Sequence, residues 1–229
     1  HRPQHHFPSG FCGARKCGSR NDRCCASRFV IDMVSASLET RFQTLCNEAA
    51  ACRICPELAD KAAVLSPLNG TLSPKVFFIA EAPGRQGADR TRRPFYGDKS
   101  GDNFQTLLDS ISLSRDEIFI TNSVMCSPRT ATDANRKPSR MEIRNCSGYL
   151  QRQIALLRPM VVATLGSVAL GAIKVIEDHG FTLKQDAGKT LEWNDRTLVP
   201  LYHPSPQVIA AQRGLGRQLE HFQSLASVL

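Results

Sequence analysis

Four of the nine cysteines fall into one spaced pattern, and this pattern constrains the fold more than any other feature of the chain. Cys52 and Cys55 form a C-x2-C pair, and Cys126 and Cys146 follow after a long insert. A C-x2-C turn directs two sulfurs inward, and a fold that brings distant segments back to that turn adds two more. The pattern therefore predicts four thiolates around one metal centre.

Apolar strands alternate with helical periodicities from about residue 36 onward. Apolar runs predict four strands, at residues 75–80, 118–121, 160–165 and 198–201, and residues 193–196 predict a hairpin turn before the last of them. Helical spacing of apolar residues predicts helices near residues 36–50, 104–111, 139–157, 168–176 and 207–225. This alternation predicts a three-layer α/β/α sandwich around a central four-stranded, mainly parallel sheet.

The first 32 residues differ in composition from the rest. They are rich in His, Arg, Gly and Ser and show no hydrophobic periodicity, so we expect residues 1–32 to be a disordered or non-native extension. Met33 would make a natural start, and we expect residues 33–229 to form one domain. A small zinc site in the extension is the alternative, but the spacing of its cysteines is irregular: Cys12, Cys17, Cys24 and Cys25.

The chain is basic, with a net charge of +8 and a sequence pI of about 9.2. Such a charge favours a polyanionic partner, although half of it comes from residues 1–32. No apolar run is long enough to span a membrane, and the N-terminus lacks a secretory apolar segment. We therefore expect an intracellular, cytoplasmic protein without a membrane partner, whose cysteines are metal ligands or thiols rather than disulfides.

Polar side chains follow three of the predicted strands at the point where each strand ends. Glu81 begins the segment Glu-Ala-Pro-Gly, Asn122 follows the second strand, and His203 follows the fourth. Each residue alone is more typical of a turn or a satisfied polar group than of a site. Because ligands bind where parallel strands end, the convergence of an acid, an amide and a histidine at one edge favours a functional site there.

Several motifs occur in a fixed order along the chain. They are the C-x2-C turn, Glu81-Ala-Pro-Gly84, the segment 93–101 with Phe95 and Asp98, the run 120–126, the pair Asn135-Arg136, the 142–146 helix, Leu165-Gly166 and His203-Pro-Ser-Pro206. Together they resemble the iron-sulfur members of the uracil-DNA glycosylase superfamily, families 4 and 5, over about residues 38–222. Glu-Ala-Pro-Gly resembles family 4, and the stretch 87–98 resembles family 5.

The resemblance implies a role for each residue of the pocket. Cleaving an N-glycosidic bond produces a cationic sugar and an anionic base, and the base must first be flipped out of the DNA helix. Phe95 would stack on uracil, Asn122 would read its O4/N3 edge, and His203 would donate to O2. The remaining substrate contacts would come from the 96–97 turn and from Ala82, Pro83, Gly84 and Ser205. The alternative for Phe95 is a core aromatic.

The catalytic carboxylate has three candidates. Family 4 places an acid shortly after its first motif, where this chain has Gly87, whereas the family 5 aspartate matches Asp98. We therefore favour Asp98, followed by Glu81 and then Asp89. The alternative for Asp98 is an ordinary Gly-Asp turn.

The resemblance also identifies the metal centre as a [4Fe-4S] cluster held by Cys52, Cys55, Cys126 and Cys146. It would be structural, and a zinc ion bound by the same four thiolates is the alternative. Cys46 is expected to be an ordinary buried thiol.

Basic residues predict where DNA would bind. Arg136 and Arg140 lie in or beside the loop 127–139, and Arg213 ends a segment placed to enter the minor groove after His203. The alternative for the loop is a solvated surface segment.

These features predict a monomeric uracil-DNA glycosylase that initiates base excision repair, with DNA containing uracil or another deaminated base as its partner. Hypoxanthine and xanthine are further candidate bases, and the enzyme would associate with the nucleoid. The alternative is a non-catalytic iron-sulfur DNA-binding protein of the same fold, which the presence of Asn122 and His203 argues against.

Overall fold

The computed structural model describes residues 36–211 and 214–229, and residues Ser37–Leu229 form one compact unit. The predictions for residues 1–32, including the zinc alternative, and for Arg213 lie outside the described residues. None of the helices in the described part of the chain is long and apolar enough to cross a membrane.

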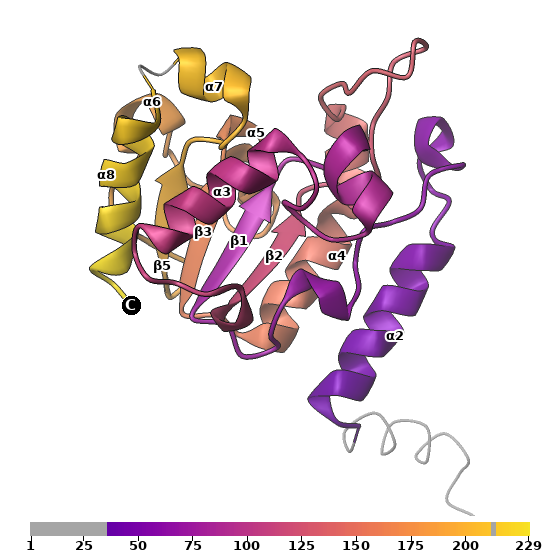
Figure 1. Ribbon diagram of the computed structural model, residues 1–229. Coiled ribbons are helices and arrows are strands. Elements are labelled where there is room, and N and C mark those ends of the chain that lie inside the picture. Colours follow the sequence, from indigo (N-terminus) through magenta and orange to yellow (C-terminus); the bar gives the residue numbers. More distant parts are fainter. Residues whose placement is uncertain (1–35, 212–213) are drawn as a thin grey trace, which may run out of the picture. The chain divides into compact units, whose positions relative to one another are not determined.

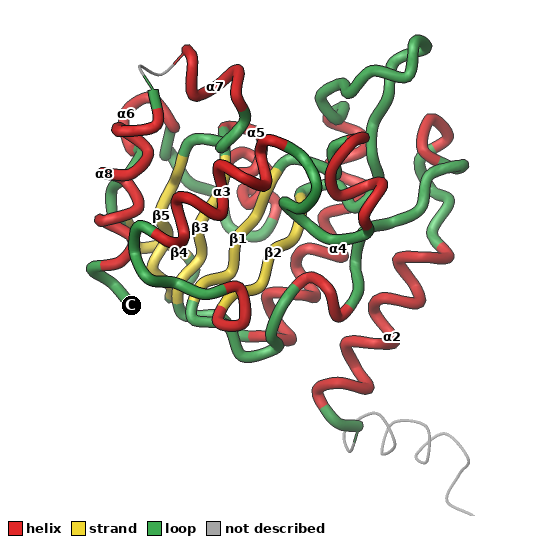
Figure 2. Tube along the Cα trace, in the orientation of Figure 1, coloured by secondary structure: helices red, strands yellow, loops and turns green. Residues whose placement is uncertain are grey.

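A mainly parallel sheet forms the centre of this unit (Figures 1 and 2). Its strands lie in the order β2-β1-β3-β5-β4, and all neighbours are parallel except β4 and β5. The predicted parallel α/β class is confirmed, but the predicted number of four strands is wrong, because the sheet has five. Their bounds are β1 Val76–Ala80, β2 Ile118–Asn122, β3 Val161–Leu165, β4 Leu191–Trp193 and β5 Arg196–Leu201.

The additional strand, β4, is the first arm of the predicted hairpin. Asn194 and Asp195 both adopt positive φ angles, 51° and 54°, and Trp193 pairs with Arg196 across the turn. Two left-handed residues in a two-residue loop are typical of a type I′ hairpin, which Asn and Asp favour. Only three residues long, β4 is too short to produce a recognisable period in the sequence.

Helices cover both faces of the sheet, which confirms the three-layer arrangement. Alternate side chains of β1 point to opposite faces: Phe77 and Ile79 pack with α2, α4 and α5, whereas Val76 and Phe78 pack with α3 and α8. The bounds are α2 Leu38–Ala51, α3 Lys99–Asp109, α4 Arg140–Leu157, α5 Ser167–Ala172, α6 Leu183–Asp186, α7 Pro206–Ala211 and α8 Leu215–Ala226. Shorter helical turns occur at Pro56–Leu58, Pro67–Asn69, Arg85–Asp89, Arg115–Glu117 and Ile173–Val175.

Two helix ends illustrate how the local sequence determines the boundaries. Ser139 caps α4 and forms a reciprocal capping box with Glu142, so the N-terminal boundary predicted for this helix is confirmed. The single helix predicted over residues 207–225 is wrong, because it is divided into α7 and α8. Gly214, with a φ of 94°, is the N-cap of α8, and a left-handed residue cannot continue an α-helix.

Candidate active site

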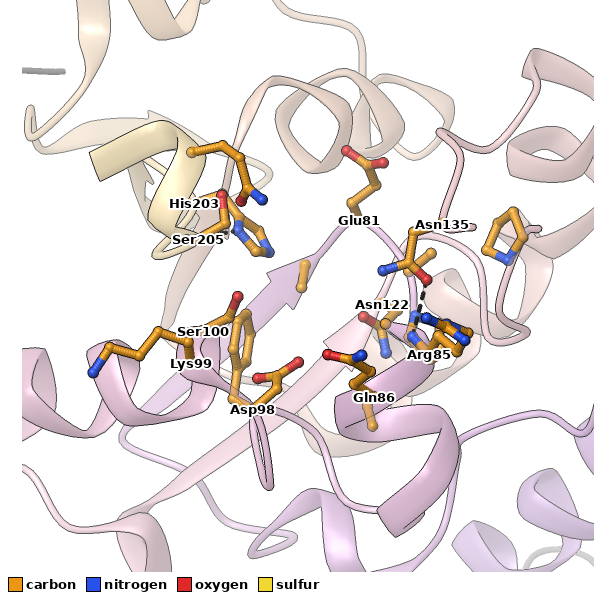
Figure 3. Close-up of a pocket in the computed structure, with 18 of the residues that line it drawn as sticks. Glu81, Arg85, Gln86, Asp98, Lys99, Ser100, Asn122, Asn135, His203 and Ser205 are labelled. Atoms are coloured by element: carbon orange, nitrogen blue, oxygen red, sulfur yellow. Dashed lines mark hydrogen bonds between the residues drawn. The ribbon is translucent and has the colours of Figure 1, made fainter. Parts of the chain in front are cut away.

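The carboxyl edge of the sheet borders a cavity of about 600 Å³. Strands β1, β2 and β5 end at this edge, and each contributes a residue at its end or within two residues of it: Glu81, Asn122 and His203. Figure 3 shows these side chains with Asp98 around a common space. Further residues lining the cavity are Ala82, Pro83, Gly84, Phe95, Ser205, Asn135, Arg136 and Lys137.

Asn122 presents an unpaired amide to this cavity. It is the last residue of β2, pairs in register with Ala80 of β1 and is only 3% exposed. Ser123 fixes the chain after it, since both its N–H and its hydroxyl donate to the carbonyl of Ala80. No group in the described part of the chain accepts a hydrogen bond from Asn122 Nδ2. A buried, unpaired donor is destabilising, so a ligand that accepts from it would remove that penalty.

His203 is held in one tautomer by the turn that follows it. The backbone N–H of Ser205 donates to His203 Nδ1 at 3.1 Å, so a neutral ring carries its proton on Nε2. Burial lowers the pKa of His203 to about 4, because the cationic ring would be poorly solvated here. At neutral pH, His203 is therefore a neutral donor through Nε2.

Asp98 is both the N-cap of α3 and part of the cavity wall. Its Oδ1 accepts a hydrogen bond from the Gly101 N–H at 2.9 Å. Its carboxylate also lies against the backbone of Gly87, on the segment that follows β1. One oxygen is therefore fixed by the helix, and the group as a whole borders the cavity.

The other two acids differ sharply in environment. Glu81 lines the cavity, and burial raises the pKa of its carboxyl group, although the charge of Lys137 opposes this effect. Asp89 instead forms ion pairs with Arg129 and Arg92 and does not line the cavity. Only Asp98 and Glu81 of the three candidates therefore border the space where a ligand would bind.

Phe95 belongs both to the core and to the cavity. It is 9% exposed, and its ring stacks on that of Phe104 with centroids 4.6 Å apart. Its φ of 48° places it in the left-handed region, and Arg115 Nη2 donates to its carbonyl at 2.7 Å. The two interpretations of Phe95 are thus compatible, since a core aromatic also presents part of its surface to the cavity. Tyr96 and Gly97 do not line the cavity in the described structure.

The basic loop between residues 127 and 139 contains both engaged and exposed cations. Arg136 forms an ion pair with Glu142, and Arg129 forms ion pairs with Asp89 and Asp133. Lys137 and Arg140 are exposed at the protein surface. Of the positions expected to contact DNA, Arg140 thus has an accessible side chain, whereas Arg136 also stabilises the start of α4.

The four predicted cysteine ligands are neighbours. The pKa of Cys146 is raised to about 12, mainly by burial, and Cys126, Cys55 and Cys52 are near enough to contribute to this shift. Two sulfurs also accept hydrogen bonds, Cys146 from the Met125 N–H at 3.3 Å and Cys55 from Asn145 at 3.4 Å. Among residues 36–211 and 214–229, no group of three His, Cys, Asp or Glu side chains is arranged to hold a single metal ion.

The sequence profile of the uracil DNA glycosylase superfamily matches residues 67–228. The chain belongs to the uracil-DNA glycosylase superfamily. The matched range includes the residues that line the cavity, together with Cys126 and Cys146, whereas Cys52 and Cys55 precede it.

Curated members of the superfamily from two types match the chain. The type-4 uracil-DNA glycosylase of Archaeoglobus fulgidus is 33% identical over 163 residues, which cover 69% of this chain and 78% of that protein. The type-4 enzyme of Sulfurisphaera tokodaii is 33% identical over 144 residues, 61% of this chain and 63% of its own length. The type-5 uracil-DNA glycosylase of Pyrobaculum aerophilum is 28% identical over 189 residues, 70% of this chain and 80% of that protein.

One further residue of the cavity, Asn135, was assigned no role from the sequence. Asn135 lines the cavity, and its Oδ1 accepts a hydrogen bond from the Arg85 N–H at 3.0 Å. This contact ties the loop 127–139 to the turn that follows β1. The signal in the sequence is the Asn-Arg pair before Pro138, which indicates family membership but not the direction of a side chain.

Proposed function

We propose that the protein hydrolyses the N-glycosidic bond of uracil in DNA and so initiates base excision repair. The observation that carries this proposal is the buried amide of Asn122, whose donor lacks a partner in the described part of the chain and which lines the cavity. Uracil presents a carbonyl oxygen next to an N–H, and an Asn amide offers the complementary donor and acceptor. Names of the curated relatives support the same substrate.

The flipped base would bind between Phe95 and the segment that follows β1. Phe95 offers an aromatic surface, which binds any flat base, and Asn122 selects among bases by their edges. Ala82, Pro83 and Gly84, which directly follow Glu81, also line the cavity. Other deaminated bases, including hypoxanthine and xanthine, are part of the proposed range.

His203 would stabilise the departing base. As the C1′–N bond breaks, negative charge develops on the uracil oxygens, and a donor already fixed in position stabilises this charge without reorganisation. The Ser205 N–H holds Nδ1, so Nε2–H is the group that can donate to O2. Because the ring is neutral, it would stabilise the departing base by a hydrogen bond and would keep its own proton.

Asp98 would stabilise the cationic sugar or activate the attacking water. Its hydrogen bond to the Gly101 N–H fixes the carboxylate before the substrate arrives. Glu81 is the second candidate, but burial raises its pKa and so makes its anionic form less favourable. The two acids are therefore expected to contribute unequally.

We propose further that Cys52, Cys55, Cys126 and Cys146 hold a [4Fe-4S] cluster. Their proximity and the N–H groups aimed at two of the sulfurs fit a cluster, whose thiolates commonly accept such hydrogen bonds. The cluster would be structural, joining the end of α2 to the segment after Asn122. A zinc ion held by the same four cysteines is the alternative, and absorbance near 400 nm distinguishes the two, since zinc is colourless.

Lys137 in the basic loop and Arg140 at the start of α4 are the proposed phosphate contacts, and Arg213 remains a proposed contact of the segment after His203. We also propose that the protein acts as a monomer in the nucleoid. A non-catalytic DNA-binding protein remains the second candidate.

A single-turnover release assay tests the proposed function. Oligonucleotides containing uracil, hypoxanthine or xanthine are compared in single- and double-stranded form, with Asp98→Asn, Glu81→Gln and Asn122→Ala as variants. We expect uracil release by the wild type, a loss of about 100-fold or more for Asp98→Asn, and both slower release and poorer base discrimination for Asn122→Ala. If Glu81→Gln is inactive and Asp98→Asn releases uracil at the normal rate, the catalytic carboxylate is Glu81 and not Asp98. Absence of release from every substrate would favour the DNA-binding alternative.

A further inference from the structure

The backbone at Gly87 lies unusually close to the carboxylate of Asp98. A Cβ atom placed on Gly87 would lie 2.2 Å from Asp98 Oδ2 and 2.7 Å from Asp98 Cγ. Both distances are far below van der Waals contact. Gly84, three residues earlier in the chain, differs: a Cβ there would lie 3.7 Å from Asp98 Oδ2, which is ordinary contact.

The carboxylate of Asp98 cannot move aside without losing a contact. Its other oxygen accepts the hydrogen bond from the Gly101 N–H that caps α3. Rotation of the short aspartate side chain would move both oxygens together and so break this cap. A side chain at position 87 and the observed carboxylate at position 98 therefore exclude one another.

We infer that Gly87 is a positioning residue: the absence of a side chain there determines where the Asp98 carboxylate lies. The consequence for catalysis rests on the proposed function, in which this carboxylate faces the cationic sugar. Gly87 itself offers no group for the reaction. Its effect on the reaction would come through the position of Asp98.

Gly87→Ala is expected to separate catalysis from binding. The added methyl displaces the carboxylate, so the single-turnover rate should fall by about 100-fold, to the level of Asp98→Asn. Affinity for DNA containing 2′-fluoro-deoxyuridine, which resists hydrolysis, should change by less than threefold. Gly171→Ala is the matched control, because a Cβ at Gly171 meets nothing within 4 Å and the rate should be preserved.

Thermal unfolding provides a second, activity-independent readout. Gly87→Ala should lower the melting temperature by about 2–4 °C when Asp98 is present, because the displaced carboxylate gives up its cap. In an Asp98→Ala background no carboxylate remains to be displaced, so the same substitution should have little effect. A perturbation of the backbone by the methyl itself would lower the melting temperature in both backgrounds.

The outcomes separate this inference from the catalytic proposal. Loss of the Gly87→Ala effect on melting in the Asp98→Ala background supports the positioning role, whatever happens to the rate. The same coupling with normal rates for both Gly87→Ala and Asp98→Asn supports the positioning role and overturns Asp98 as the catalytic acid. Equal effects of Gly87→Ala on melting with and without the Asp98 carboxylate overturn the inference.

Discussion

The guanidinium of Arg136 donates two hydrogen bonds to the carboxylate of Glu142, from Nη1 to Oε2 at 2.9 Å and from Nη2 to Oε1 at 2.6 Å. The same carboxylate accepts from the Ser139 N–H at 2.7 Å and completes the capping box of α4. Arg136 thus closes the basic loop onto the helix that carries Cys146. This arrangement changes what substitutions in the loop should do.

Arg136→Ala should destabilise the fold more than it weakens DNA binding. Removing the guanidinium leaves the Glu142 carboxylate, whose side chain is 6% exposed, without its cation, which costs about 3 kcal/mol. Lys137→Ala, at the next and exposed position, is the matched control and should leave the free energy of unfolding unchanged. Urea denaturation of both variants measures the difference.

In DNA binding, by contrast, the order should reverse. Lys137→Ala and Arg140→Ala should each reduce the slope of log affinity against log salt by about one unit, because a phosphate contact releases about one counterion. If only Arg136→Ala changes the slope, the phosphate contact is made by Arg136 and not by Lys137 or Arg140. Affinity that does not depend on salt would remove DNA from the proposed partners.

Glu142 should contribute to stability only above acidic pH. The hydrogen bonds from Arg136 lower the pKa of Glu142 below its ordinary value of 4.5, so the unfolded chain takes up a proton first as the pH falls. The contribution is therefore complete above pH 4.5 and is lost as the pH falls through the folded pKa. The stability difference between the wild type and Glu142→Gln should be constant from about pH 6 to 8 and shrink below about pH 4.5. A difference that does not shrink as the pH falls below about 4.5 would contradict this assignment.

His203 should remain neutral through the working range of the enzyme. Its pKa of about 4 lies below the ordinary value of 6.5, so the unfolded chain binds the proton first, and the contribution of neutral His203 to stability decreases as the pH falls from 6.5 toward 4. Nitrogen NMR should detect the Nε2–H tautomer at neutral pH, and His203→Ala should lower single-turnover release by about 100-fold or more. A ring that titrates near its ordinary pKa of 6.5 would show that it is solvated instead.

Cysteine substitutions should divide into two classes. Cys52→Ala or Cys146→Ala should abolish the absorbance near 400 nm and lower stability by several kcal/mol, as lost metal sites do. Cys46→Ala is the control, because this thiol is buried in the core on α2. This substitution should leave the iron content unchanged. Iron analysis and thermal unfolding are the measurements. Full iron content in Cys52→Ala would exclude it as a ligand.

The sequence predicts those parts of the fold that depend on local apolar periodicity. The predicted N-terminal ends of strand β1 and helix α4 lie within one residue of the observed ones, because a continuous apolar run and a capping box are both written in adjacent residues. The division between α7 and α8 depends on the backbone conformation of Gly214, for which the helical spacing around it gives no signal. Helix propensity is a weak guide where the backbone conformation of a single residue ends one helix and starts another.

Strand ends and the family resemblance identify the residues of the candidate site, but their mutual contacts are not predictable from the sequence. That Asp98 lies against Gly87 depends on how α3 is placed beside the turn after β1, a tertiary contact. Arg115 supports Phe95 from a position 20 residues along the chain, and no pattern in the sequence joins them. Predicting such contacts requires the distances between helices and strands, and the periodicity of apolar residues does not give these distances.

The pairing of the strands has a consequence for how the protein is made. Strand β1 pairs with β3, and β3 pairs with β5, which ends at Leu201, so these three strands can pair only after the residues of β5 have left the ribosome. Until then the apolar residues of β1 have no partner on one edge and no complete cover, which is the condition under which nascent chains aggregate. Translation speed and chaperone supply should therefore determine the yield of folded protein as strongly as its final stability does.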